Sequence, residues 1–277
     1  MATLTTDVQG GVFAHEHARI LDGLRRGAGE LPTLGETYAP EVVAAVATVW
    51  RARMVNEHRS SAVFAGLLPQ LIDASVTLDA QTVVLRMASD EIHHAALCGH
   101  VLAAFGETPR AVVPDRVDPM PAHADVSPLE RVTRNVLVVG CLAETVAVAL
   151  LSEERARSTD PLVRAVLDQI LADEVTHARF GWSFLAHALA SLDADARATL
   201  DRYLRVAFAS LERHELDRLV PAGPMRGELK AQRESLGVCD GTDGREVFYA
   251  TVDQVIVPRL EAFGLGARDA WKHRHAV

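Results

Sequence analysis

The sequence is poor in cysteine and has no uninterrupted apolar run long enough to cross a membrane. Its three cysteines, Cys98, Cys141 and Cys239, form no CxxC pair and no disulfide framework, which argues against a zinc ribbon or a rubredoxin-type iron site and favours a reducing compartment. The most apolar stretch, 136–151, contains Glu144 and is shorter than the ~20 apolar residues that span a bilayer. The first ten residues lack the basic and apolar regions of a signal peptide. We therefore expect a soluble, cytoplasmic protein with no membrane partner.

Aromatic residues and positive charge are also scarce. Aromatic residues make up only 5% of the chain, and the apolar residues are mainly Ala, Val and Leu, which suit closely packed helices better than a sheet. The formal net charge is -9, whereas a nucleic-acid partner usually requires a basic face. The composition therefore predicts an all-α protein that does not bind nucleic acid.

Helical periodicity and capping signals predict four long helices, at 40–68, 79–105, 128–157 and 161–190. The first begins at Pro40 and is expected to stop before Pro69. The third opens with Ser127-Pro128-Leu129-Glu130, a capping box with proline at the first helical position. The proline-rich segment 106–126 lacks helical periodicity and fits a crossover that runs the length of a bundle.

Further helices are expected at 193–219 and 245–263, with a Gly-rich, charged loop between them and no strand in the chain. We expect three parts: an N-terminal extension (1–39) with at most a short helix at 12–24, a helical bundle (40–220), and a C-terminal helical extension of the same domain (221–277).

A sequence repeat relates the second and fourth predicted helices. The second contains Asp90-Glu91-Ile92-His93-His94-Ala95, and the fourth contains Asp173-Glu174-Val175-Thr176-His177-Ala178. The helix before each motif carries a glutamate in an apolar setting, Glu57 in one case and Glu144 in the other. The two helix pairs therefore look like two copies of one plan, joined by the crossover.

This pattern is typical of a site for two metal ions. A Glu and a His three residues apart share one helix face, and four packed helices can bring two such pairs and two more glutamates to one point. Carboxylates and imidazoles without thiolates suit iron or manganese, and four carboxylates neutralise two divalent ions. The predicted ligands are Glu57, Glu91, His94, Glu144, Glu174 and His177.

The alternative is that these six residues are ordinary polar positions on amphipathic helices. Glu144 argues most strongly against this, because it lies among sixteen mostly aliphatic residues, where an unpartnered carboxylate is costly. Asp90 and Asp173 each lie one residue before a ligand glutamate. They are predicted to accept the second N–H of a ligand histidine, on their own helix or across the bundle, unless they are simply solvated.

Small residues surround Glu144 along its helix. Gly140, Cys141, Ala147 and Val148 share its predicted face and could form a dry pocket for an organic substrate. Close helix packing favours small residues equally well, so both interpretations stay open.

The set Glu57, Glu91-x-x-His94, Glu144, Glu174-x-x-His177 resembles the ferritin-like di-iron carboxylate superfamily over about residues 40–190. The resemblance implies a ferritin-like four-helix bundle with a long crossover between its second and third helices, two iron ions (or a manganese–iron pair), and dioxygen as a co-substrate. The hydroxylases and desaturases of that superfamily carry a threonine one turn after the third helix's glutamate, where this chain has Ala147 and Val148. The subfamily is therefore left open.

The resemblance favours an oxidase or oxygenase that acts on a small or medium organic substrate. Electrons would come from the substrate or from an electron-donor protein, and a homodimer is expected because dimers are common with this fold. Alternatives are a ferroxidase or peroxide-scavenging protein without an organic substrate, a scaffold protein with a structural metal, and, against the negative charge, a tRNA-hydroxylating enzyme.

Overall fold

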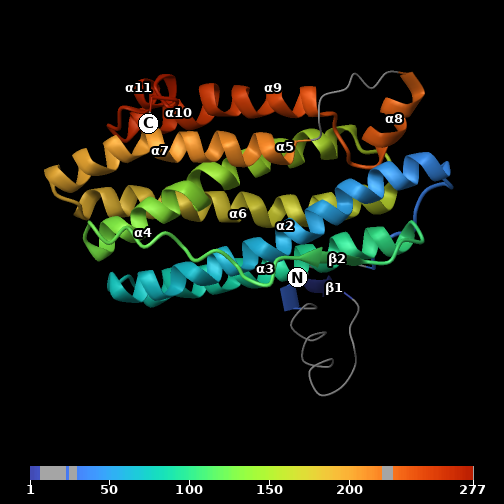
Figure 1. Ribbon diagram of the computed structural model, residues 1–277, viewed down its shortest axis with the longest axis horizontal. Coiled ribbons are helices and arrows are strands. Elements are labelled where there is room, and N and C mark those ends of the chain that lie inside the picture. Colours follow the sequence, from blue (N-terminus) through green and yellow to red (C-terminus); the bar gives the residue numbers. More distant parts are fainter. Residues whose placement is uncertain (7–22, 25–29, 220–226, 277) are drawn as a thin grey trace, which may run out of the picture.

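Four long helices run alongside one another in the computed structural model, which describes residues 1–6, 23–24, 30–219 and 227–276 (Figure 1). They are α2 (Pro40–Asp73), α3 (Leu78–Ala104), a continuous rod formed by α4 (Pro128–Val136), η1 (Leu137–Ala143) and α5 (Glu144–Arg157), and α6 (Pro161–Ser191). The segment between α3 and α4 returns along the bundle, as expected of a crossover. The predicted helical bundle is confirmed. The short helix expected at 12–24 lies outside the described residues, apart from its last two.

Side-chain caps fix where two of these helices begin. The Ser127 hydroxyl accepts a hydrogen bond from the Glu130 amide at 3.2 Å, as the capping box predicts. The Asp160 carboxylate accepts from the amides of Leu162 and Val163 at 3.0 and 3.1 Å. Asp160 also accepts from the Tyr38 hydroxyl at 2.9 Å, so the same side chain ties the approach to α2 to the start of α6.

The prediction that the first helix stops before Pro69 is wrong, because α2 continues through this residue to Asp73. Pro69 costs one backbone hydrogen bond, and tertiary contacts of the next turn offset that loss. Leu71 is fully buried, and the Gln70 side-chain carbonyl accepts from the Asn135 amide at 2.8 Å. Packing therefore overrides the local signal.

The expectation of no strand is also wrong. Strands β1 (Ala2–Thr5) and β2 (Arg110–Val113) form a two-stranded antiparallel sheet in which Ala2 pairs with Val113 and Thr5 with Arg110. The Arg51 guanidinium of α2 donates to the carbonyls of Thr108 at 2.6 Å and Arg110 at 2.9 Å, which fixes β2 against the bundle. Four-residue strands give almost no periodic signal, and this pair depends on contacts far apart in the sequence.

The third rod of the bundle contains a π-helix that the sequence analysis did not anticipate. Segment η1 ends at Ala143, and the amide of Glu144 donates to the carbonyl of Val139, five residues back. The wider turn coincides with a close crossing, because a Cβ on Gly140 would lie 2.9 Å from the Cα of Gly181 on α6. π-helical turns often occur at functional sites, and this one directly precedes a predicted ligand.

A second helical layer covers one side of the bundle. It comprises α7 (Ala194–Arg218), α8 (Gly227–Ser235), α9 (Gly241–Thr251), η2 (Val252–Ile256), α10 (Val257–Ala262) and α11 (Ala267–Lys272). The helix expected at 245–263 begins earlier, at Gly241, because the Asp240 carboxylate caps it through the amides of Thr242 and Asp243. Helix α8 was not predicted.

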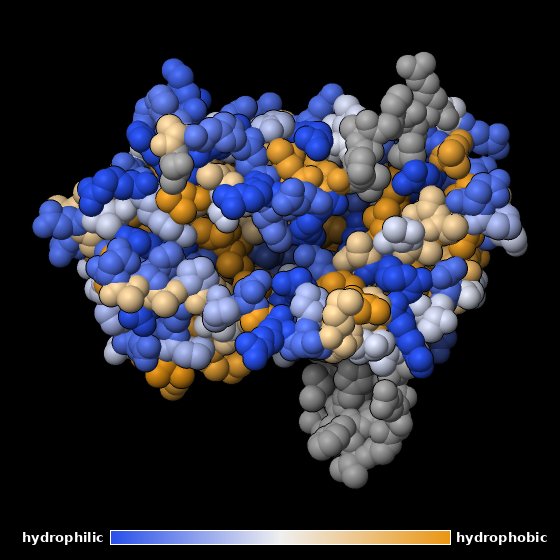
Figure 2. Space-filling model, in the orientation of Figure 1, coloured by the Kyte–Doolittle hydropathy of each residue, from blue (hydrophilic) through white to orange (hydrophobic). Residues whose placement is uncertain are grey.

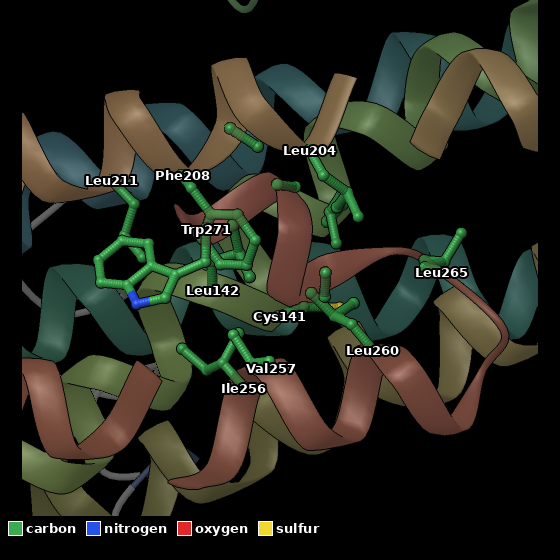
Figure 3. Close-up of a cluster of buried hydrophobic side chains, with 14 of the residues drawn as sticks. Cys141, Leu142, Leu204, Phe208, Leu211, Ile256, Val257, Leu260, Leu265 and Trp271 are labelled. Atoms are coloured by element: carbon green, nitrogen blue, oxygen red, sulfur yellow. The ribbon is translucent and has the colours of Figure 1, made fainter. Parts of the chain in front are cut away.

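This layer shares an apolar core with the third rod of the bundle. Figure 3 shows Cys141 and Leu142 of η1 packed against Phe208 of α7 and Leu260 of α10, with Trp271 closing one side. All of these side chains are buried. The C-terminal helices therefore cover the outer face of η1, while its inner face meets α6.

One helix among the described residues, Pro128–Arg157, is long and apolar enough to cross a membrane by length and composition. Half of its most apolar window is buried within the structure.

Candidate metal centre

The six predicted ligands converge in the middle of the bundle from all four of its rods. Glu57 comes from α2, Glu91 and His94 from α3, Glu144 from the first residue of α5, and Glu174 and His177 from α6. All six are buried, the two histidines completely. Helical spacing explains the convergence, since residues three apart on α3 and on α6 present a carboxylate and an imidazole on one face.

The donor atoms fall into two overlapping groups, each compact enough to hold a cation. One contains Glu57, Glu91, His94 and Glu174, the other Glu144, Glu174 and His177, and within each group the donor atoms lie within 4.8 Å of one another. Glu174 belongs to both, with its Oε1 3.4 Å from Nδ1 of His94 and its Oε2 3.3 Å from Nδ1 of His177. Glu91 also reaches the second group, with Oε1 3.2 Å from Nδ1 of His177. Glu174 and Glu91 therefore lie between the two positions.

Each imidazole is hydrogen-bonded through its Nε2 to one aspartate, and this aspartate comes from the opposite helix of the bundle. Nε2 of His94 on α3 donates to Asp173 on α6 at 3.3 Å, and Nε2 of His177 on α6 donates to Asp90 on α3 at 3.4 Å. Each aspartate thus orients the histidine of the opposite motif and leaves its Nδ1 facing the carboxylates. The Asp90 carboxylate also accepts a hydrogen bond from Nε of Arg86 at 2.6 Å. Arg86 was not among the predicted site residues, although a spacing of four residues on a helix is a usual sign of an ion pair.

Several buried atoms at the centre have no hydrogen-bond partner in the part of the chain that the structure describes. They are Nδ1 of His94, Nδ1 of His177, Oε2 of Glu144 and Oε2 of Glu174. Each buried polar atom without a partner costs free energy, and these four lie together in the predicted ligand set. Two cations would supply the missing partners and offset the four buried carboxylates, so the residues present fit a di-metal group.

The pKa values of the cluster show how much charge is concentrated in it. Burial, reinforced by the Glu174 carboxylate, raises the pKa of Glu91 and of Glu144 well above the usual value. Burial alone would lower the pKa of His94 and His177, but the hydrogen bonds to Asp173 and Asp90 and the nearby glutamates outweigh burial and raise both pKa values. The pKa of Glu174 is lowered despite its burial, because the Glu144 carboxyl and both imidazoles lie close to its carboxylate and favour the charged form. The metal-free cluster therefore retains protons that cations would displace.

The centre is more open on one side than on the other. The side chains of Glu57 and Glu144 are 9% and 10% exposed, against 2% for Glu91 and none for His94. Phe64 of α2 covers part of the histidine side, with its ring edge-on to His177 at a centroid distance of 5.4 Å. Figure 2 shows a hollow near the middle of the face drawn, with hydrophilic residues at its base and hydrophobic patches on its rim.

Two of the four predicted pocket residues serve helix packing instead. Gly140 lies against Gly181, and Cys141 is fully buried among the C-terminal helices (Figure 3). The π-helical turn explains this, because it shifts the face that regular helical spacing would assign to residues before Glu144. Ala147 and Val148 are half-buried on α5, and their part in a pocket remains a prediction.

No protein-family model matches the sequence, and a search of curated proteins finds no match either. Among solved structures, the chain is similar to a protein from Synechococcus described as having aldehyde deformylating oxidase activity. The TM-score is 0.55 at 16% identity, and the match covers 87% of this chain and 100% of the other. At this identity the similarity concerns the fold, which is therefore that of the ferritin-like helical proteins.

Proposed function

We propose that this protein is a di-metal oxidoreductase that uses dioxygen to oxidise a small or medium organic substrate. The observation that carries the proposal is the convergence of four glutamates and two histidines in the bundle core, where four of the six leave a buried atom without a hydrogen-bond partner among the described residues. Iron suits this donor set, with manganese as a possible partner, because carboxylates and imidazoles are hard or borderline ligands and no thiolate is among them. Two ferrous ions would supply the electrons and the open coordination positions that dioxygen chemistry requires.

The chain's own residues would perform distinct parts of this chemistry. His94 and His177 each present one nitrogen to a metal position, and their aspartates hold the rings in place. Glu174 and Glu91 lie between the two positions and would help to hold an ion at each of them. Glu57 and Glu144 are more exposed than Glu91 and the two histidines, and each would hold one ion on the side open to a substrate.

The same side is where we expect a substrate to enter. The bundle closes the histidine side with Phe64 and with complete burial of both imidazoles, which excludes water there. We take the hollow in Figure 2 as the candidate entrance, because hydrophobic rims and a hydrophilic base suit a molecule with one polar end and an apolar remainder. An aldehyde with an alkyl chain has this character. The activity named for the similar Synechococcus structure makes aldehydes the first class to screen.

The test is anaerobic loading with ferrous iron, followed by rapid mixing with oxygenated buffer in the presence and absence of aldehydes of graded chain length. We expect two iron ions per chain, a transient visible absorbance, and oxygen consumption coupled to a new product. Glu144→Ala should lose the second iron and the product. Glu153→Ala is the matched control, since Glu153 lies on the same helix and pairs with Arg157 away from the centre.

Other outcomes would change the proposal in defined ways. Rapid iron oxidation that releases ferric ion, unaffected by any organic compound, would replace it with the ferroxidase alternative. Tight metal binding without oxygen consumption would indicate a structural metal. A chain that binds no stoichiometric metal would contradict the proposal.

A further inference from the structure

The outward face of α3 is a continuous line of uncharged residues. Seven positions, separated by four and three residues in turn except for a final step of four, fall within about 80° of the helix circumference, since successive residues are about 100° apart. We call this line the α3 stripe, and it consists of Leu78, Thr82, Leu85, Ser89, Ile92, Ala96 and His100. The spacing is that of a helix–helix seam, repeated over nearly the whole length of α3.

Large apolar side chains of the α3 stripe are exposed. Leu78 is 78%, Leu85 48% and Ile92 38% exposed. Helix α3 lies along the lower edge of the molecule in Figure 1, and hydrophobic residues gather at the lower left of the same view in Figure 2. An outward helix face normally carries charge, as α6 does with exposed Arg164, Asp168 and Arg179. An exposed apolar line of this kind marks an interaction surface.

We propose that a second copy of this chain docks on the α3 stripe, with the two α3 helices antiparallel about a twofold axis near Ser89. The polar groups at the two ends favour this occupant and this direction, because an imidazole N–H can donate a hydrogen bond to a carboxylate. The stripe begins beside Asp79, an exposed carboxylate, and ends at exposed His100. An antiparallel pair brings the acidic end of each copy to the imidazole end of the other and opposes the two helix dipoles, whereas a parallel pair would place Asp79 against its own copy.

The arrangement is self-complementary along the seam. With the axis at Ser89, the short Ser89 side chains of the two copies meet at the centre. Leu85 of each copy then lies near Ile92 of the other, and Thr82 lies opposite Ala96 of the other. Close approach at a small central residue and apolar contact on both sides of it suit an isologous interface. The inference does not depend on metal or on catalysis, so it can fail or hold independently of the proposed function.

The first test is the mass of the full-length chain in solution, by light scattering after size exclusion and by sedimentation, at micromolar concentration. We expect a dimer for the natural sequence and a monomer for Leu85→Glu. Val206→Glu is the matched control, because Val206 is a similarly exposed (43%) apolar residue on a different helix, α7, and it should remain a dimer. A monomeric natural chain, or a Leu85→Glu variant that stays dimeric while folded, overturns the proposal.

The second test locates the axis and does not rely on disrupting the interface. Ser89→Cys should form an intermolecular disulfide with its own copy under mild oxidation, since it lies on the axis and is partly exposed. Leu78→Cys should not, because it lies 11 residues away, or about 16 Å along the helix, and its two copies are about 33 Å apart. The natural chain is the blank, and Cys239→Ser in every variant removes the one native thiol among the described residues that is not buried, since Cys98 and Cys141 are buried. Cross-linking through position 78 instead of position 89 overturns the antiparallel arrangement.

Discussion

Asp90 on α3 lies 3.4 Å from Nε2 of His177 on α6, across the bundle from its own motif. The reciprocal contact, Asp173 with His94, completes a pair of crossed supports. The aspartate of each sequence motif is therefore hydrogen-bonded to the histidine of the other motif. The two halves of the centre are consequently interdependent, and loss of one aspartate should affect a metal position assigned to the opposite helix.

Asp90→Asn and Asp173→Asn are each expected to lower metal affinity by about 10- to 100-fold without unfolding the bundle. An asparagine can offer its amide instead of a carboxylate, so the imidazole loses its charged support and its fixed orientation. Competition with a coloured chelator would measure the affinity. Asp168→Asn is the control, since Asp168 is an exposed residue of α6 that pairs with Arg155. Equal affinity in all three variants would contradict the role given to the aspartates.

The stability of the metal-free protein is expected to fall as pH rises from 6.5 upward, whereas the metal-loaded protein should be much less sensitive. A pKa raised by folding stabilises the fold below the unfolded-state pKa, and this contribution is lost as pH rises through the folded-state pKa. Glu91, Glu144, His94 and His177 all have raised pKa values. The lowered pKa of Glu174 stabilises the fold above the usual glutamate pKa, and this contribution is lost only as pH falls below that range.

Thermal melts with and without metal over this pH range would test the expectation. The difference between the two melting temperatures should widen with pH, and Glu144→Gln should reduce the pH dependence of the metal-free protein. Glu153→Gln, on the same helix but away from the cluster, should leave it unchanged. A metal-free protein that becomes more stable with rising pH would show that the cluster does not retain protons.

The four bundle rods could be predicted from the sequence because their signals are local. Serine, aspartate and proline at helix starts determine the first turn, and the Glu-x-x-His spacing shows which residues share a face. The same spacing places each Glu-His pair on one face of its helix and so anticipates the convergence in the core. The assignment of Asp90 and Asp173 to opposite histidines was not available from spacing alone, since it depends on how α3 and α6 are placed against each other.

The features that could not be predicted depend on contacts distant in sequence. Helix α2 passes through Pro69 because Gln70 and Leu71 are held by other elements. The two short strands exist only as a pair. The π-helical turn at η1 is tied to the crossing of Gly140 and Gly181, and it moved Cys141 from the predicted pocket into the C-terminal core.

Gly181→Ala should destabilise the fold by about 3 kcal/mol, because a Cβ there would lie 2.2 Å from the carbonyl carbon of Gly140 and backbone on two helices would have to separate. Gly66→Ala is the control within a helix. Its Cβ would meet only the Met120 side chain, at 3.5 Å, and the better helix propensity of alanine should stabilise by up to about 1 kcal/mol. Urea unfolding of both variants would separate the two cases. Equal effects would mean that the crossing is not tight.

The last prediction concerns the ion pair between Arg53 of α2 and Glu154 of α5. Their side chains are 12% and 16% exposed, and Nη2 lies 2.6 Å from Oε2. Glu154→Ala leaves the guanidinium without this carboxylate, so we expect a loss of about 3 kcal/mol in unfolding free energy. The next carboxylate along α2 is Glu57, one helical turn away, and attraction of Arg53 toward it should also weaken metal binding at that ligand.

Urea unfolding and chelator competition on the same preparation would measure both effects of Glu154→Ala. The exposed pair Arg155–Asp168 provides the comparison, since Asp168→Ala breaks an ion pair that solvent already screens and should change neither measurement. If Glu154→Ala lowered stability but left metal affinity intact, Arg53 would serve only to join α2 to α5. If Glu154→Ala lowered both stability and metal affinity, the ion pair would also hold the Arg53 guanidinium away from Glu57. A second replacement in the same variant, Arg53→Met, should then restore the metal affinity.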